Sequence, residues 1–295
     1  MVLRTLLFVP GNQKRRIEKA HSVAADALIL DLEDSVPSAE KDSAREMVAS
    51  SIKGLASDGQ EVFVRINSLS TPHAITDIRA VVRNGLKGIV LPKSGSAEDI
   101  QKADTLIANA EKEKGLEIDS ISILPLVETP MGIINANKIA SASSRIMGIT
   151  LGAEDYTLEM GITRTGEGDE LYYPRTVISL ACHAIDILAI DSVYTDIRDT
   201  EGLIRETRMV KQMGFQGKLV IHPDQIGPVN QVFVPSDEEI SQAQRVLETY
   251  NTAVSEGRAS TSLDGRMVDA PVAARAKRLL ALAESIASKG SARPT

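Results

Sequence analysis

The sequence predicts an α/β fold, a (β/α)8 barrel of the TIM type with extra C-terminal helices. Eight short runs rich in Val, Ile and Leu recur along the 295 residues. Runs such as Ala-Leu-Ile-Leu at 27–30 do not alternate polar and apolar side chains, which is typical of parallel strands that helices cover. Segments of helical period separate the runs. An alternation that repeats eight times favours a closed barrel over an open doubly wound sheet.

The apolar runs give the expected strands, at residues 3–9, 27–31, 61–66, 88–91, 121–127, 146–151, 187–193 and 218–221. Helices are expected between them, among others at residues 14–24, 39–52, 74–84, 97–113, 174–185 and 201–213. Ser38, Ser96 and Asp199 stand where a side chain can cap a helix N-terminus. Gly54 and Gly85 stand where a helix commonly ends.

The segment after the eighth strand differs in character. It predicts a helix at about 237–256, a link rich in Gly, Ser and Thr, and an Ala-rich helix at about 270–287. We therefore expect a barrel over residues 1–235 and a C-terminal helical extension over 236–295. This extension lies outside the barrel proper, where it can form a lid or reach a neighbouring subunit.

Composition excludes several classes of protein. The chain has 33 Lys plus Arg against 40 Asp plus Glu, a net charge of -7, which argues against a nucleic-acid partner. Cys182, the single cysteine, cannot form an internal disulfide, so a reducing, cytoplasmic setting is expected. No apolar run approaches the ~20 residues of a membrane span, and Arg4 interrupts the N-terminal run, which indicates a first strand instead of a signal peptide. The glycine fingerprints of the common nucleotide-binding folds are absent.

Polar side chains follow nearly every expected strand. The strand ends carry Asp31-Leu32-Glu33-Asp34, Arg65-Ile66-Asn67, Pro92-Lys93, Glu128-Thr129-Pro130, Glu154-Asp155, Asp196 and His222-Pro223. In such barrels the catalytic face is formed by the carboxyl ends of the strands. A single acid after a strand is ordinary, but polar ends on seven strands predict an active site on this face.

Glu128 and Asp155 close neighbouring strands, so their carboxylates can converge on one point. Two carboxylates without a nearby histidine or cysteine suit Mg2+, which takes few protein ligands and completes its octahedron with water and substrate. Asp31, Glu33 and Asp34 could orient water bound to such an ion. The alternative for Glu128 and Asp155 is a capping or ion-pair role.

Arg65 is expected to point into the mouth of the barrel, where its guanidinium fork matches a substrate carboxylate. The alternative is a permanent ion pair with one of the acids after the second strand. Lys93 raises a rival chemistry, a Schiff base with a ketone substrate, which the acid pair disfavours. His222 serves either the site or the structure.

A basic stretch, Lys14-Arg15-Arg16, follows Pro10-Gly11-Asn12 near the N-terminus. Basic residues at a helix start form either a phosphate site or a solvated face.

Several motifs occur in order along almost the whole chain: Leu-Phe-Val-Pro-Gly-Asn (7–12), Leu-Asp-Leu-Glu-Asp-Ser-Val (30–36), Val-Arg-Ile-Asn (64–67), Leu-Pro-Lys (91–93), Val-Glu-Thr-Pro-Met-Gly (127–132), Leu-Gly-Ala-Glu-Asp-Tyr (151–156), Gly-Lys-Leu-Val-Ile-His-Pro-Asp-Gln-Ile (217–226) and Asp-Gly-Arg-Met-Val-Asp-Ala-Pro (264–271). Together they resemble the citrate lyase β-subunit-like family of the HpcH/HpaI aldolase superfamily, alongside malyl-CoA and citramalyl-CoA lyases.

The resemblance implies a barrel that binds Mg2+, with Mn2+ as a substitute, and cleaves a 3-hydroxy-carboxyacyl thioester into an acetyl thioester and a 2-oxo acid. It implies that Glu128 and Asp155 hold the metal, that Glu128 also meets the substrate, and that Arg65 binds the substrate oxygens. It makes Asp269 the group that exchanges a proton with the enolate carbon over a neighbour's barrel, and therefore implies a homotrimer or hexamer.

The resemblance also places Asn12, Lys14 and Arg16 against the phosphates of coenzyme A. His222-Pro223 after the last strand is similar to freestanding CoA lyases, so an acyl-CoA substrate is preferred. The alternative is the β subunit of a citrate lyase complex, which acts on a citryl thioester carried by an acyl carrier protein and gives oxaloacetate. Two further alternatives remain: an aldolase that acts on free 2-oxo acids, and a barrel without catalytic activity that serves as a scaffold.

Overall fold

Eight parallel strands close into a barrel in the computed structural model, which describes residues 2–291. The strands are β1 (Thr5–Pro10), β2 (Ala27–Asp31), β3 (Glu61–Arg65), β4 (Leu86–Leu91), β5 (Ser122–Val127), β6 (Gly148–Leu151), β7 (Leu188–Asp191) and β8 (Gly217–Val220). Each strand pairs with its neighbours in chain order, and β8 closes the ring against β1, with Leu6 opposite Leu219. The predicted (β/α)8 fold is confirmed.

Apolar side chains from alternating strand positions fill the barrel. Leu6, Phe63, Leu124 and Ile190 are fully buried and belong to one cluster inside it. The residues between them face the helices, which is why the strand sequences do not alternate polar and apolar residues. The barrel interior is therefore a packed core.

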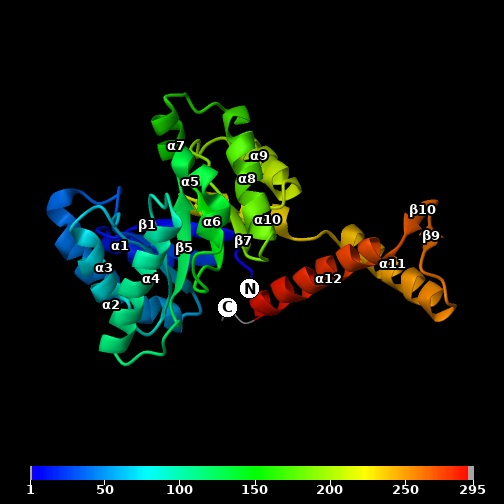
Figure 1. The fold of residues 1–295 in the computed structure, drawn as a ribbon, viewed down its shortest axis with the longest axis horizontal. Coiled ribbons are helices and arrows are strands. Elements are labelled where there is room, and N and C mark those ends of the chain that lie inside the picture. The colour runs from blue at the N-terminus through cyan, green and yellow to red at the C-terminus, as the bar shows by residue number, and fades with distance from the viewer. Residues whose placement is uncertain (1, 292–295) are drawn as a thin grey trace. The chain divides into compact units, whose positions relative to one another are not determined.

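Within the described residues, nine helices lie between consecutive barrel strands in the chain, and a tenth follows β8. Figure 1 labels all of them. They are α1 (Lys14–Ala20), α2 (Lys41–Ser57), α3 (His73–Val81), α4 (Ala97–Glu113), α5 (Pro130–Ile134), α6 (Ala136–Ala140), α7 (Ala153–Met160), α8 (Tyr172–His183), α9 (Thr200–Gln212) and α10 (Ile226–Phe233). Three 3-10 turns are η1 (Ser38–Glu40), η2 (Asp169–Leu171) and η3 (Pro223–Gln225).

The predicted caps at Ser96 and Asp199 are confirmed. Ser96 Oγ accepts the Asp99 N–H at 3.2 Å in a reciprocal capping box, and Asp199 Oδ1 accepts the Gly202 N–H at 2.8 Å. The structure differs at Ser38, which begins the short turn η1, so that α2 starts only at Lys41.

A cluster of charged residues stabilises the end of the barrel that is formed by the amino ends of the strands. Arg145, just before β6, donates from Nη2 to Glu111 at 2.7 Å and from Nε to Asp104 at 2.6 Å. The side chains of Arg145 and Glu111 are both 0% exposed. Glu111 also accepts the Ile121 N–H at 2.9 Å, which ties α4 to the start of β5. At the amino ends of barrel strands such a cluster serves stability.

We expect Arg145→Leu to lower the free energy of unfolding by about 3–5 kcal/mol, because it leaves the Glu111 carboxylate buried without its ion partner. Urea titration followed by circular dichroism measures the change. The matched control is the double variant Arg145→Leu/Glu111→Leu, which leaves no unpaired charge and should regain part of the loss. A single variant as stable as the wild type would contradict a structural role for the pair.

The same pair makes stability depend on pH. Burial alone would raise the pKa of Glu111, but the hydrogen bonds and charge of Arg145 hold it below its usual value. A carboxyl whose pKa is lowered on folding contributes stability above its unfolded pKa and loses it as pH falls through the folded pKa. Acid should therefore destabilise the wild type more steeply than the double variant.

Contacts divide the described chain into two units, the barrel over Leu3–Gln231 and a second unit of residues 232–291 with Val2. The predicted extension at 236–295 includes 292–295, which lie outside the described residues. In the second unit, α11 (Asp237–Ser255) and α12 (Ala270–Ser291) pack side by side, with the hairpin β9 (Thr261–Leu263) and β10 (Arg266–Val268) between them in the chain (Figure 1). The sequence predicted a plain link there. Val246, Val268 and Ala276 form its small core.

In residues 2–291, no helix is both long enough and apolar enough to cross a membrane.

Candidate active site

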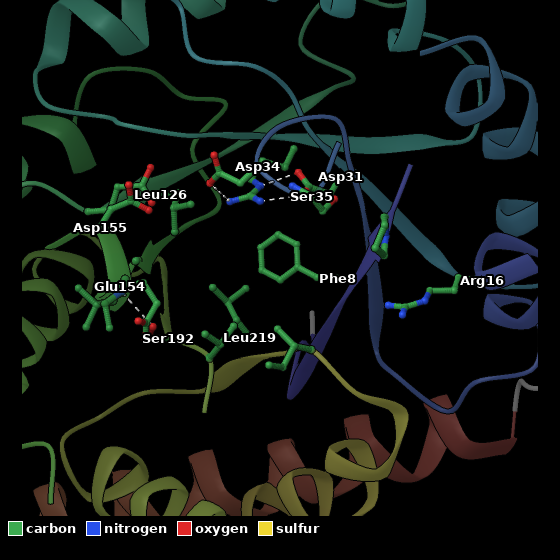
Figure 2. Close-up of a pocket in the computed structure, with 18 residues that line it drawn as sticks. Phe8, Arg16, Asp31, Asp34, Ser35, Leu126, Glu154, Asp155, Ser192 and Leu219 are labelled. Atoms are coloured by element: carbon green, nitrogen blue, oxygen red, sulfur yellow. Dashed lines mark hydrogen bonds and ion pairs between the residues drawn. The ribbon is translucent and has the colours of Figure 1, made fainter. Parts of the chain in front are cut away.

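A pocket of about 440 Å³ opens beyond the carboxyl ends of the barrel strands. Its lining includes Phe8 from β1, Asp31 from β2 and Arg65 from β3, together with Glu128 after β5 and Asp155 after β6. In Figure 2 the ring of Phe8 points into the pocket, with Asp31 on one side and Asp155 across from Arg16. The structure thus brings the predicted acids and the predicted arginine to one cavity.

Glu128 and Asp155 reach this pocket from the segments that follow two neighbouring strands, β5 and β6. Glu128 directly follows β5 and is 2% exposed, whereas Asp155 lies in the first turn of α7 with its side chain 34% exposed. Gly152, between β6 and α7, makes their approach possible, because a Cβ there would lie 2.5 Å from both Cβ and Oε2 of Glu128. Any larger residue at 152 would push Glu128 out of place.

The Glu128 carboxyl is poorly compensated within the chain. Burial raises the pKa of Glu128 to about 8, and the negative charge of Asp155 adds to the effect. The Lys93 N–H opposes the shift by donating to Glu128 Oε1 at 2.7 Å. A carboxyl in this state favours either a proton or a cation close to it.

The donor set fits a small divalent cation. Glu128 and Asp155 offer carboxylate oxygens, the ligand type that Mg2+ prefers, and one or two protein carboxylates are its usual complement. Over residues 2–291 no group of three His, Cys, Asp or Glu side chains converges as a complete metal site. The arrangement therefore suits an ion that keeps positions open for water and substrate, and it does not suit Zn2+.

Arg65 is fixed by a two-pronged ion pair. Its Nε and Nη2 donate to the two oxygens of Asp31, both at 2.7 Å. Its third nitrogen, Nη1, lies 3.2 Å from Glu33 Oε2 and 3.5 Å from Asp34 Oδ2. The guanidinium also stands 4.9 Å from the centroid of the Phe8 ring. The ion pair left open as an alternative is present, and the side chain nevertheless lines the pocket.

The acids beside Arg65 differ in charge state. Burial alone would raise the pKa of Asp31, but the hydrogen bonds and charge of Arg65 hold it below its usual value. Burial raises the pKa of Glu33 to about 7, although the charge of Arg65 opposes the shift. Asp31 is therefore the anion that orients Arg65, and Glu33 is a group that titrates near neutral pH.

Of the basic residues near the N-terminus, Arg16 lines the pocket and Lys14 does not. Lys14 is 77% exposed, with Glu18 at 3.9 Å. Asn12 donates to Glu40 at 2.8 Å, and its buried Oδ1 has no hydrogen-bond partner among the described atoms. Lys14 is the first residue of α1, which also contains Arg16 and has only seven residues.

His222 and Asp269 are the remaining predicted residues, and His222 does not line the pocket of the acid pair. His222 accepts the Asp224 N–H at 3.2 Å and lines a second hollow of about 230 Å³, together with Arg16 and Lys19. Asp269 belongs to the other unit and caps α12 by accepting the Val272 N–H at 3.1 Å. In the structure, Asp269 thus acts as the N-terminal cap of α12.

Sequence reasoning missed three residues that shape the pocket. Phe8 packs on Arg65, Gly152 admits Glu128, and Ser192 Oγ accepts the Ala153 N–H at 3.0 Å and so supports the start of α7. A signal existed only for Gly152, since a glycine directly before Ala-Glu-Asp at a strand end indicates a close backbone approach. Phe8 and Ser192 look in the sequence like ordinary strand residues.

Fold and site together define a TIM-barrel protein with two carboxylates, the buried Glu128 and the partly exposed Asp155, and an anchored arginine at the strand carboxyl ends. The chain belongs to the HpcH/HpaI aldolase/citrate lyase family, whose model matches residues 4–223. The family resemblance seen in the motifs is thereby confirmed.

Relatives within this family carry more than one name. Citrate lyase subunit beta of Leuconostoc mesenteroides subsp. cremoris is 42% identical over 96% of this chain and 93% of its own length. Mitochondrial citramalyl-CoA lyase of Homo sapiens is 32% identical over 97% of this chain and 87% of its own length. Among solved structures, protein CitE of Mycobacterium tuberculosis in complex with magnesium, acetoacetate and coenzyme A is 32% identical, with a TM-score of 0.79 over 96% of this chain and 98% of that chain. The chain is a lyase of this family.

Proposed function

We propose that the protein is a Mg2+-dependent carbon–carbon lyase that cleaves a 3-hydroxy-carboxyacyl-CoA thioester, of the citramalyl-CoA or malyl-CoA type, into acetyl-CoA and a 2-oxo acid. The observation that carries the proposal is the meeting of Glu128, Asp155 and Arg65 in one pocket. Relatives named citramalyl-CoA lyase and L-malyl-CoA/beta-methylmalyl-CoA lyase support it, as does a structural neighbour bound to magnesium and coenzyme A.

Glu128 and Asp155 are the residues that would hold the cation. When bound, Mg2+ supplies Lewis acidity to the hydroxyl and carboxylate of the substrate that become the 2-oxo acid. The chain's own contribution is to fix the two carboxylates: Lys93 donates its N–H to Glu128, and Gly152 leaves room for it.

Arg65 is proposed to stabilise the thioester oxygen. Cleavage of the bond between the hydroxyl-bearing carbon and the methylene carbon leaves the electron pair on the thioester enolate, so negative charge grows on that oxygen. Asp31 accepts from Nε and from one N–H of Nη2, and Nη1 donates to Asp34 at 3.5 Å beside Glu33. The second N–H of Nη2 is therefore the donor proposed to meet the substrate. A donor held in place before the reaction stabilises such developing charge without reorganising.

Asp269 is proposed to deliver the proton that turns the enolate carbon into the methyl group of acetyl-CoA. One proton leaves the substrate hydroxyl and one arrives at carbon, so cleavage needs no net acid or base. The assignment comes from the Gly-Arg-Met-Val-Asp motif at 265–269, and it carries with it a homo-oligomer in which Asp269 serves a neighbour's barrel.

Arg16, with Asn12 and Lys14, is proposed to meet the coenzyme A phosphates. Arg16 lines both the main pocket and the 230 Å³ hollow, so it connects the acid pair to a basic, partly apolar recess that also holds Lys19. A nucleotide-bearing thioester needs such a cationic approach, and a free 2-oxo acid does not.

The second candidate is the β subunit of a citrate lyase complex, acting on a citryl thioester bound to a carrier protein. The 42% identity to a citrate lyase subunit beta favours it. Both candidates share the same type of bond cleavage and the same residues. They differ in the acyl group and in whether coenzyme A or a carrier protein holds the thioester.

A direct assay distinguishes the candidates. The purified protein with Mg2+ is offered citramalyl-CoA, malyl-CoA and citryl-CoA, and release of acetyl-CoA is followed with and without a chelator. We expect rapid cleavage of one thioester that the chelator abolishes and added Mg2+ restores. Cleavage that survives the chelator would contradict the metal site. Silence on all three, together with cleavage of the carrier-bound citryl thioester, would transfer the assignment to the second candidate.

A further inference from the structure

The backbone of Lys93 adopts an unusual conformation at the carboxyl end of the barrel. Its φ is +52°, in the left-handed region that a residue with a Cβ disfavours. Over residues 2–291 the other non-glycine residues with positive φ are Asp119, Asp186 and Asp264, and aspartate is a type enriched in this region. Lysine lacks the short polar side chain that stabilises such a turn locally, so the surroundings of Lys93 must hold it.

Those surroundings are the two acids of the pocket. The Lys93 N–H donates to Glu128 Oε1 at 2.7 Å, and the next N–H, of Ser94, donates to the Leu126 carbonyl at 3.2 Å. The Lys93 ammonium lies 3.9 Å from Asp155 Oδ1. Lys93 thus contacts both carboxylates. Its neutral N–H meets Glu128, and its charged ammonium meets Asp155.

The two contacts respond differently to a bound cation. A neutral N–H uses one lone pair of Glu128 and leaves the rest of the carboxylate free. The ammonium repels a cation held by Asp155, since both are positive. The Lys93 side chain is 47% exposed and its ion pair is long, so it can leave Asp155 for water with little loss.

We propose that Lys93 is a positioning residue for the metal site: its N–H fixes Glu128 for the divalent cation, and its ammonium holds Asp155 only until the cation binds. The inference rests on the proposed metal site and adds the residue that prepares it. Removing the charge alone should therefore tighten cation binding, whereas disturbing the left-handed turn should weaken it.

The test measures Mn2+ binding to the full-length protein without substrate, by the electron paramagnetic resonance signal of free Mn2+. Lys93→Gln keeps the N–H and the side-chain bulk but not the charge, and Lys93→Gly also relieves the positive φ. We expect both to lower the Kd for Mn2+ about threefold to tenfold. Lys93→Val also removes the charge, but its branched Cβ resists positive φ, so its Kd should exceed that of Lys93→Gln at least about threefold.

The matched control is Lys87→Gln, which removes a lysine charge from the amino end of β4, the strand that precedes Lys93, and should leave the Kd unchanged. A Kd for Lys93→Gln within twofold of wild type, or higher, would overturn the role of the ammonium. Equal Kd values for Lys93→Val and Lys93→Gln would overturn the role of the N–H, and Lys93→Ala replaces the Val variant if that does not fold.

Glu128→Gln separates this inference from the proposed function. If Glu128→Gln binds Mn2+ like the wild type, the metal site itself is wrong. If Glu128→Gln loses Mn2+ and Lys93→Gln behaves like the wild type, only the Lys93 inference fails.

Discussion

Glu128→Gln is expected to lower kcat for thioester cleavage by about 10³-fold or more, because it removes a proposed ligand of the cation, which would supply several kcal/mol of charge stabilisation. The substitution keeps the shape of the side chain, and its amide oxygen can still accept the Lys93 N–H that Glu128 accepts at 2.7 Å. The fold should therefore persist. Steady-state kinetics with acetyl-CoA release, alongside isothermal titration with Mg2+, measures the two effects.

The matched control is Glu159→Gln, which removes an exposed carboxylate from α7, the helix that carries Asp155. It changes net charge by the same amount and should leave kcat within about twofold, as exposed charges have weak effects. Full activity of Glu128→Gln, or an equal loss in the control, would refute the assignment of Glu128 to the metal.

The fold could be predicted because its signal repeats. Each strand of the barrel is a short apolar run, and each of the longer helices, such as α4 and α9, has enough turns for its period and its cap to show. The helices α5, α6 and α7 were missed because they have only five to eight residues, too few for a periodic pattern.

The site could be predicted in part. Consecutive barrel strands are neighbours, so polar residues at successive strand ends must lie on one rim, and this places Glu128 near Asp155 without any coordinates. The pairing of Arg65 with Asp31 could only be left as an alternative, since register decides it: the two residues are directly opposed in the β2–β3 ladder.

Backbone details of the loops were beyond prediction. The left-handed turn at Lys93 and the contact of Gly152 with Glu128 depend on where two loops meet in space. No local propensity favours positive φ at a lysine, so its neighbours impose it. Such local conflicts between propensity and structure concentrate at functional sites.

Asp269→Asn is expected to lower kcat about 10²- to 10⁴-fold, the usual contribution of a positioned acid or base, with little change in KM. Asp269 caps α12 through the Val272 N–H, and Asn is as good a cap as Asp, so the second unit should fold normally. The substitution therefore removes the carboxyl group proposed to exchange the proton and leaves the structural role. Circular dichroism and thermal melting verify the fold. If the variant is so destabilised that unfolding accounts for the lost activity, Asp269 is only a cap.

Mixing two inactive variants tests whether Asp269 acts on a neighbour. Asp269→Asn keeps Glu128 in its own barrel, and Glu128→Gln keeps Asp269 in its C-terminal unit, so an oligomer of both contains barrels with an intact acid pair beside an intact Asp269. If the residue serves a neighbouring barrel, random exchange of subunits in an equal mixture completes about one site in four and should restore about a quarter of wild-type activity. Each variant alone has lost a factor of about 10² or greater. If Asp269 serves its own barrel, no mixed oligomer holds a complete site and the mixture stays silent.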